Sequence, residues 1–160
     1  MKWKIDKERD LEKVVEKVFE IIEKKINKEK KATVIALYGD LGSGKTTFTK
    51  YLAKFLGIKD LITSPTFVIQ KSFSILKGFG SKKEIFKKLT HIDAYRIESA
   101  EELIKLNWIE NISQAENLIV VEWPEKILEI LPKEIIPLHF NFINETTREV
   151  SIEEIDNFDD

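Results

Sequence analysis

A glycine-rich segment directly after a short apolar run places the tightest constraint on how this chain can fold. The segment extends from Gly39 to Thr46, reads Gly-Asp-Leu-Gly-Ser-Gly-Lys-Thr, and matches the phosphate-binding loop pattern G-x-x-x-x-G-K-[ST]. Residues 33–38 predict a strand that delivers this loop, and residues 46–56 predict a helix that leaves it and stops at Gly57. In that arrangement, backbone N–H groups and the helix N-terminus point at an anion.

The pattern is specific for phosphate binding. A shuffled chain of the same composition would contain about 0.003 matches, so a glycine-rich turn between core elements is the weaker interpretation. The glycines let the main chain approach the phosphates, the Lys45 ammonium reaches the β and γ oxygens, and the Thr46 hydroxyl ligates Mg²⁺. The loop residues predicted to bind ATP are Leu41, Gly42, Ser43, Gly44, Lys45, Thr46 and Thr47.

Length and composition favour one domain. A chain of 160 residues buries enough surface to fold unaided, and we expect one P-loop ATPase domain over residues 1–160, with 156–160 as a frayed tail. The absence of cysteine excludes disulfides and thiolate nucleophiles and favours a cytoplasmic location. No signal peptide or membrane span is predicted. A net charge of −2 suggests no broad basic face, which disfavours tight, direct binding to RNA.

Hydrophobic periodicity predicts an α/β fold, a mixed β-sheet of the P-loop NTPase type flanked by helices and extended by β-hairpins. Alternation over residues 67–75 and 85–93 predicts an antiparallel hairpin with a long tip at 76–84. The other predicted elements are an amphipathic helix at 6–26 opened by Asp6, a short helix at 101–106 capped by Ser99, a buried strand at 118–121, a helical segment at 124–131 stopped by Pro132, and a hairpin of 136–143 with 149–155.

Two carboxylates are predicted to lie beside the phosphate loop. Glu122 ends the buried strand, where P-loop proteins place their second acidic residue, although aspartate is commoner there. The carboxyl ends of strands gather at the ligand edge of such a sheet. If the predicted hairpin pairs antiparallel, Thr66 and Asp93 share that edge. Either carboxylate could ligate the metal directly or through water.

Three further side chains near these positions have two interpretations each. His91 could contact a phosphate or relay a proton, or it could be a packed surface residue near the end of its strand. Trp123 could stack on a base or a partner, or belong to the core. Arg96 could stabilise transition-state charge, or pair with a carboxylate of the following helix.

Four motifs together resemble one family, in order, over roughly residues 11 to 150. The motifs are Gly39 to Phe48 around the phosphate loop, Ser64-Pro65-Thr66-Phe67, His91-Ile92-Asp93-Ala94-Tyr95-Arg96, and Val121-Glu122-Trp123-Pro124-Glu125. They are similar to those of the TsaE family, small bacterial ATPases of tRNA threonylcarbamoyladenosine synthesis. The co-linear set is far more specific than the phosphate loop alone.

The resemblance implies roles for these residues, with ATP and Mg²⁺ as cofactors. Thr46 and Glu122 would hold Mg²⁺, and Trp123 would lie close to the nucleotide. The residues expected to act in catalysis are Asp93, Glu122, Thr66 and Lys45. The family acts with a two-protein threonylcarbamoyl transferase complex of the TsaB/TsaD type, and ATP hydrolysis is expected to reset that complex. Contact with tRNA would be indirect, through the complex.

The sequence departs from the family at two places. The segment between Phe67 and His91 is longer than usual, and Asn107 stands where a glycine is common, so we expect Asn107 to adopt the left-handed conformation.

Two other functions compete with a partner-dependent ATPase of low intrinsic activity. A small P-loop kinase would need several arginines to clamp phosphates, and the chain has only Arg9, Arg96 and Arg148. A nucleotide-gated switch would order the segments of Thr66 and Asp93 to recruit a partner. Because no guanine-selecting pattern follows the phosphate loop, ATP is the preferred nucleotide.

Overall fold

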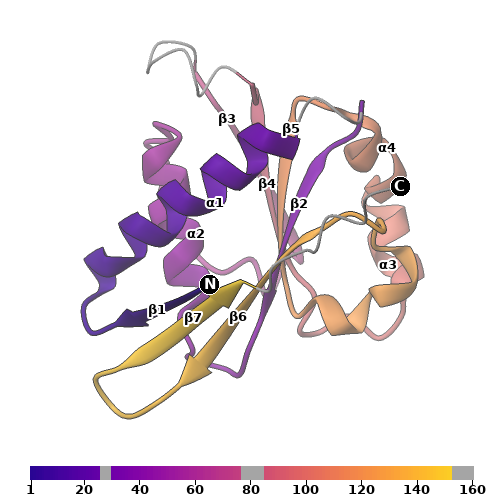
Figure 1. The fold of residues 1–160 in the computed structure, drawn as a ribbon. Helices are drawn as coiled ribbons and strands as arrows, with labels where there is room; N and C mark the ends of the chain where they lie inside the picture. Colours follow the sequence, from indigo (N-terminus) through magenta and orange to yellow (C-terminus); the bar gives the residue numbers. More distant parts are fainter. Residues whose placement is uncertain (26–29, 77–84, 153–160) are drawn as a thin grey trace, which may run out of the picture.

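The computed structural model of the chain describes residues 1–25, 30–76 and 85–152, and within them seven strands form one mixed sheet (Figure 1). The strand order across the sheet is β1-β7-β6-β2-β5-β4-β3. The strands are β1 (Lys2–Ile5), β2 (Thr33–Tyr38), β3 (Gln70–Ser74), β4 (Lys88–Asp93), β5 (Asn117–Glu122), β6 (Ile136–Phe142) and β7 (Arg148–Ile152).

The centre of the sheet is parallel and both of its edges are antiparallel. Strand β2 lies between β5 and β6 and is parallel to both, and β4 is parallel to β5. Strand β3 pairs antiparallel with β4, and β7 pairs antiparallel with β6 and β1. The P-loop-type mixed sheet with hairpin additions, predicted from the sequence, is therefore confirmed.

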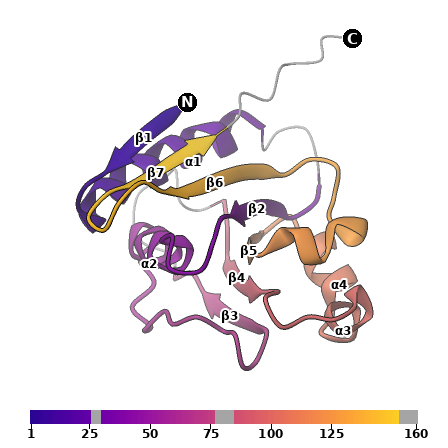
Figure 2. The ribbon, with the colours of Figure 1, turned by 90° about the horizontal axis from the view of Figure 1, so that it is seen from below.

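Helices cover both faces of the sheet (Figure 2). On one face lie α1 (Leu11–Lys25) and α2 (Lys45–Phe55), and on the other lie α3 (Ala100–Lys105) and α4 (Trp108–Ser113). Strand β5 alternates between the two cores: Leu118 and Val120 pack with the first pair of helices, Ile119 and Val121 with the second. Burial on both faces explains the continuous apolar run in its sequence.

The N-terminal helix begins later than predicted. The chain opens with the unpredicted edge strand β1, followed by a 3₁₀ turn (Glu8–Asp10), and α1 starts at Leu11 rather than residue 6. The carboxylate of Asp10 accepts hydrogen bonds from the backbone N–H groups of Asp6 and Lys7, at 3.1 and 2.9 Å. Asp10, rather than Asp6, thus supplies the side-chain acceptor at this turn, for the two backbone N–H groups that directly follow β1.

Other boundaries also differ. Strand β3 begins at Gln70 rather than 67 because the preceding residues form a turn, and β4 begins at Lys88 rather than 85. The predicted helix at 124–131 is two 3₁₀ turns, Pro124–Lys126 and Leu128–Ile130, and α4 was not predicted. The hairpin tip from 77 onward, the last residues of the final predicted strand and the tail at 156–160 lie outside the described residues.

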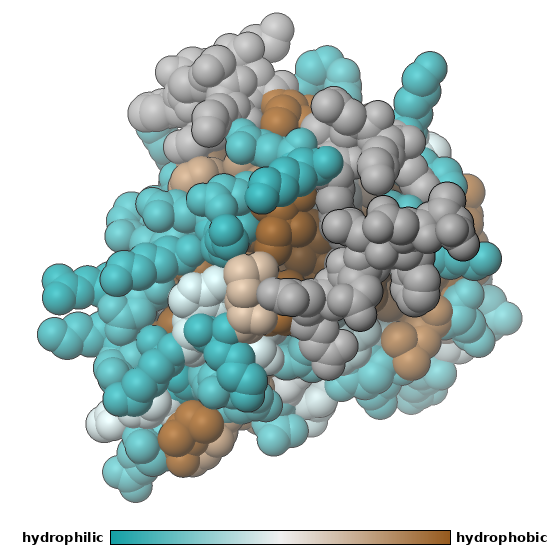
Figure 3. Space-filling view, in the orientation of Figure 1, coloured by the Kyte–Doolittle hydropathy of each residue, from teal (hydrophilic) through white to brown (hydrophobic). Residues whose placement is uncertain are grey.

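The outer surface of α1 is charged. Glu12, Lys13 and Glu16 are exposed, and the face of the molecule that carries this helix is mainly hydrophilic (Figure 3). Within residues 1–25, 30–76 and 85–152, no helix combines the length and the apolar character needed to cross a membrane.

Asn107 adopts the left-handed conformation that the sequence predicted, with φ of 63°, and α4 starts immediately after it. We expect Asn107→Ala to lower the free energy of unfolding by about 1 kcal/mol, because a Cβ-bearing residue without a compensating side chain is strained there. Asn107→Gly should leave stability within about 0.5 kcal/mol of the parent. Urea unfolding measures both, with Lys105→Ala as a helix control. Equal stability of the alanine and parent proteins would contradict this assignment of strain.

Candidate nucleotide-binding site

The phosphate loop connects β2 to α2, as the sequence predicts, and its backbone depends on glycine. Gly39 has φ of 137° and Gly44 has φ of 109°. A Cβ on Gly39 would lie 2.4 Å from the backbone oxygen of Phe140 on β6. Only glycine fits this contact, which brings the start of the loop against the neighbouring strand and aims the α2 N-terminus into the site.

The side chain of Lys45 folds back onto the first residues of the phosphate loop. Its side chain is largely buried, and Nζ donates hydrogen bonds to the backbone oxygens of Gly39 at 2.6 Å and Asp40 at 2.8 Å. Burial lowers the pKa of the Lys45 ammonium, while the negative charges of Glu122 and Asp93 oppose that change. The cation is therefore held next to the loop by neutral acceptors, which a phosphate can replace with charged ones.

The first hydroxyl of α2 meets the carboxylate that ends β5. Thr46 Oγ1 donates a hydrogen bond of 2.8 Å to Glu122 Oε1, and Glu122 is buried. The same oxygen lies 2.8 Å from Nε2 of His91, which is completely buried on β4. Residues far apart in the sequence thus form one chain of contacts beside the phosphate loop.

Asp93 forms a second polar group at the same sheet edge. It lies opposite Glu122 in the register of β4 and β5. Its Oδ2 accepts hydrogen bonds from the hydroxyls of Ser64 at 2.8 Å and Thr66 at 2.6 Å, and its Oδ1 accepts one from the backbone N–H of Tyr95 at 3.0 Å. The predicted meeting of Thr66 and Asp93 is observed.

A strained residue closes the segment that carries Thr66. Ile69 has φ of 65°, a conformation that costs a β-branched residue of order 1–3 kcal/mol. Its N–H donates to the Pro65 oxygen at 2.6 Å, and its own oxygen accepts from the N–H of Asp93 at 2.9 Å. The Ser64–Ile69 segment is thus tied to Asp93 at both ends.

The aromatic and basic residues near this edge also have defined positions. Trp123 takes a left-handed conformation directly after Glu122, and its ring centroid lies 4.4 Å from Lys45 Nζ. Arg96 stacks on the exposed ring of Phe67, with Cζ 4.4 Å from the centroid. Trp123 is therefore next to the phosphate loop, while Arg96 lies on the Ser64–Ile69 segment.

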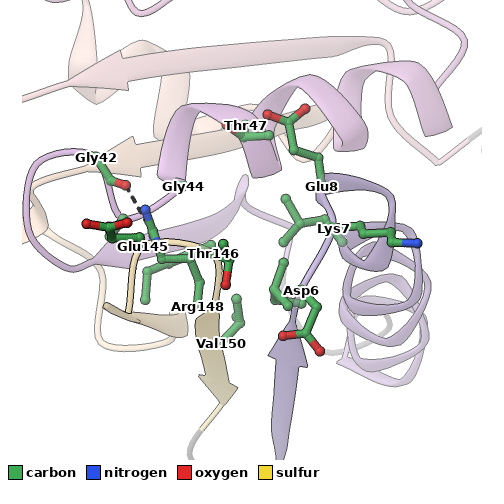
Figure 4. Close-up of a pocket in the computed structure, with 14 residues that line it drawn as sticks. Asp6, Lys7, Glu8, Gly42, Gly44, Thr47, Glu145, Thr146, Arg148 and Val150 are labelled. Atoms are coloured by element: carbon green, nitrogen blue, oxygen red, sulfur yellow. Dashed lines mark hydrogen bonds between the residues drawn. The ribbon is translucent and has the colours of Figure 1, made fainter. Parts of the chain in front are cut away.

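A pocket of about 270 Å³ borders the other side of the phosphate loop (Figure 4). It lies toward β6 and β7, whereas Glu122 is on β5, across β2. Arg148 reaches into it from β7, with Nε 3.5 Å from the Gly42 oxygen. Its lining includes Asp6, Lys7 and Glu8 from the N-terminal segment, Gly42, Ser43, Gly44 and Thr47 from the loop and α2, Glu145 and Thr146 from the β6–β7 turn, and Arg148 from β7. Sequence analysis missed this pocket because its walls come from three distant segments.

A phosphate loop at the end of a central parallel strand, with its hydroxyl bonded to a carboxylate from the next strand, defines a P-loop nucleotide-binding protein. The family described as Threonylcarbamoyl adenosine biosynthesis protein TsaE matches residues 6–150. The chain belongs to this family of tRNA threonylcarbamoyladenosine biosynthesis proteins.

Individual relatives agree with this assignment. A tRNA threonylcarbamoyladenosine biosynthesis protein TsaE from Borreliella burgdorferi is 38% identical over 63% of this chain and 66% of its own length. The protein of that name from Aquifex aeolicus is 33% identical over 92% of both chains. The crystal structure of Bacillus subtilis YdiB superposes with a TM-score of 0.63 at 25% identity, over 95% of this chain and 83% of that one.

The lowered pKa of Lys45 predicts how affinity for a triphosphate depends on pH. Bound phosphates favour the charged ammonium, so ATP affinity should fall as pH rises through the pKa of the free protein, which lies below the ordinary 10.5. Titration of a fluorescent ATP analogue between pH 7 and about 10 measures this dependence. Lys45→Arg supplies a cation that does not titrate in this range and should give a flatter profile. Equal slopes in the two proteins would contradict the assignment.

Proposed function

We propose that this chain is the ATP-hydrolysing component of tRNA threonylcarbamoyladenosine synthesis, acting in the cytoplasm as one P-loop ATPase domain over residues 1–160. In this proposal its activity is low alone and rises with a two-protein threonylcarbamoyl transferase complex of the TsaB/TsaD type, which contacts the tRNA. The observation that carries the proposal is the 2.8 Å hydrogen bond from Thr46 to Glu122 beside the phosphate loop. Family membership supports the pathway.

The donor set fits Mg²⁺ bound together with a nucleotide. Among the described residues, no group of three or more His, Cys, Asp or Glu side chains could hold a metal ion alone. Mg²⁺ is commonly held by one or two protein oxygens, waters and substrate phosphates, so a full protein cage is not needed. Thr46 could ligate Mg²⁺ through an Oγ1 lone pair while its hydroxyl proton still donates to Glu122. Thr46 would then be the direct ligand, and Glu122 would accept a hydrogen bond from a metal-bound water.

The other residues of the site would have different roles in hydrolysis. Mg²⁺ would neutralise charge on the β and γ phosphates. Lys45 would exchange its loop oxygens for phosphate oxygens, and the buried position would strengthen that interaction. Asp93 fixes the Thr66 hydroxyl, and we assign this pair to the γ-phosphate and the attacking water. Trp123 would flank the nucleotide through its contact with Lys45.

The pocket beside the phosphate loop is assigned to the nucleoside. Its walls include Gly42 to Gly44 and Thr47, so it is continuous with the loop that would bind the phosphates. A site for the γ-phosphate near Glu122 and a site for the nucleoside near Arg148 would place the triphosphate across the α2 N-terminus.

The decisive experiment measures ATP turnover by the chain alone and with the cognate transferase pair. We expect low turnover alone, stimulation by the pair, and loss of that stimulation in Glu122→Ala, which removes the acceptor of the Thr46 hydroxyl. Loss of a partner that orients a metal ligand typically lowers metal affinity or activity about 10–100-fold.

Each other outcome has a distinct meaning. Rapid turnover without the pair would contradict dependence on a partner. A phosphorylated small-molecule product would indicate a kinase instead. If Glu122→Ala stops turnover but the transferase pair still works in cells, nucleotide binding alone would be the function, as in a switch.

Placement of the nucleoside can be tested separately from placement of the phosphates. Thr47→Trp should fill the pocket and weaken ATP binding about tenfold or more, because the base and ribose lose their space. Affinity for inorganic tripolyphosphate should change much less. Lys50→Trp, which puts the same side chain on an exposed position of α2 outside the pocket lining, is the control. Equal losses for ATP and tripolyphosphate would place the nucleoside elsewhere.

A further inference from the structure

His91 is a fully buried polar residue on β4, beside the buried carboxylate of Glu122. On β4 it lies two residues after Leu89 and two before Asp93, so the three share one face. Leu89 packs in the core formed with α1 and α2, and His91 has no exposed surface. A buried imidazole needs hydrogen-bond partners, and its position two residues from the candidate site makes those partners informative.

The contacts of His91 define its protonation pattern. Nε2 lies 2.8 Å from Glu122 Oε1, whereas Nδ1 has no hydrogen-bond partner among the described residues. A hydrogen bond from this ring nitrogen to an ionised Glu122 carboxylate, which can only accept, requires the proton on Nε2. The imidazole is thus held in one tautomer by a single charge-assisted bond to Glu122.

Glu122 needs such a neighbour more than an aspartate would. Its side chain has one more rotatable bond than the aspartate that is usual at this strand end. The hydrogen bond from Thr46 therefore leaves the Glu122 carboxylate more conformational freedom than it would leave an aspartate. His91 approaches from β4 and Thr46 from α2, and both bond to Oε1. Two donors on one oxygen fix the carboxylate and leave Oε2 to accept from a water.

We propose that His91 is a positioning residue that holds Glu122 in the orientation required to accept a metal-bound water. The inference rests on the proposed use of Thr46 and Glu122 at Mg²⁺. It assigns to His91 no contact with the nucleotide and no transfer of a proton. In this role His91 is similar to the hydrogen-bond partners that orient metal ligands in other proteins. Loss of such a partner typically lowers metal affinity about 10–100-fold.

The test compares two variants by the ratio of ATP affinities measured with and without Mg²⁺. His91→Leu removes the donor but keeps an apolar volume, and His91→Gln keeps a neutral N–H at the same number of bonds from the backbone. We expect the Mg²⁺-dependent gain in affinity to fall about tenfold or more in His91→Leu and to be largely retained in His91→Gln. Metal-free ATP affinity and the melting temperature of the nucleotide-free protein report on the fold.

A general structural defect would lower the melting temperature and metal-free affinity of both variants. That result, or a full Mg²⁺-dependent gain in His91→Leu, would overturn the inference. Thr46→Ala separates this failure from failure of the metal site. If Thr46→Ala retains the Mg²⁺-dependent gain in ATP affinity, the proposed metal site is wrong. If Thr46→Ala loses that gain and His91→Leu retains it, only the role of His91 is rejected.

The parent protein supplies a readout that needs no His91 variant. The chain has two histidines, His91 and His139, so ¹⁵N chemical shifts can be assigned with His139→Gln as reference. We expect a proton on Nε2 and a bare Nδ1 for His91, with the same tautomer after Mg²⁺ and ATP are added. A proton on Nδ1 alone would overturn the inference, because Nε2 could then not donate to Glu122.

Discussion

The hydrogen bond between Thr46 and Glu122 joins the two parts of the structure on which a nucleotide site depends, the first turn of α2 and the end of β5. It forms only if the helix is seated correctly on the sheet. That seating comes from apolar packing of Phe48 and Leu52 against the core that includes Leu118 and Val120. Hydrophobic burial supplies the stability, and the polar contact fixes where the helix N-terminus points.

Each charged side chain of the candidate site has hydrogen-bond partners within the protein. Lys45 is held by backbone oxygens of its own loop, Glu122 by a hydroxyl and an imidazole, and Asp93 by the hydroxyls of Ser64 and Thr66. Buried polar groups without partners are costly, so these contacts stabilise the folded arrangement of the site. A bound nucleotide would replace or share these hydrogen bonds, and the side chains would already lie close to the positions that they need.

The sequence predicted the parts of the fold that local pattern controls and missed those that distant segments create. The phosphate loop and the β3–β4 pairing follow from local sequence pattern. The left-handed Asn107 was predicted from the glycine that is common at its position in the family. Strand β1 was missed because its four residues become a strand only by pairing with β7. The contact of His91 with Glu122 was likewise hidden, since it depends on the register of β4 against β5. Neighbouring strands, not neighbouring residues, complete the site.

Strand β1 also joins the N-terminal segment to β7. The backbone of β1 pairs with β7, and the terminal ammonium of Met1 donates to the Ile152 oxygen at 2.8 Å. Residues just after β1 form one wall of the pocket beside the phosphate loop. During synthesis that wall has no strand to hold it until residues 148–152 have left the ribosome. A chain that stopped before residue 148 would lack β7, and the pocket wall held beside it could not form.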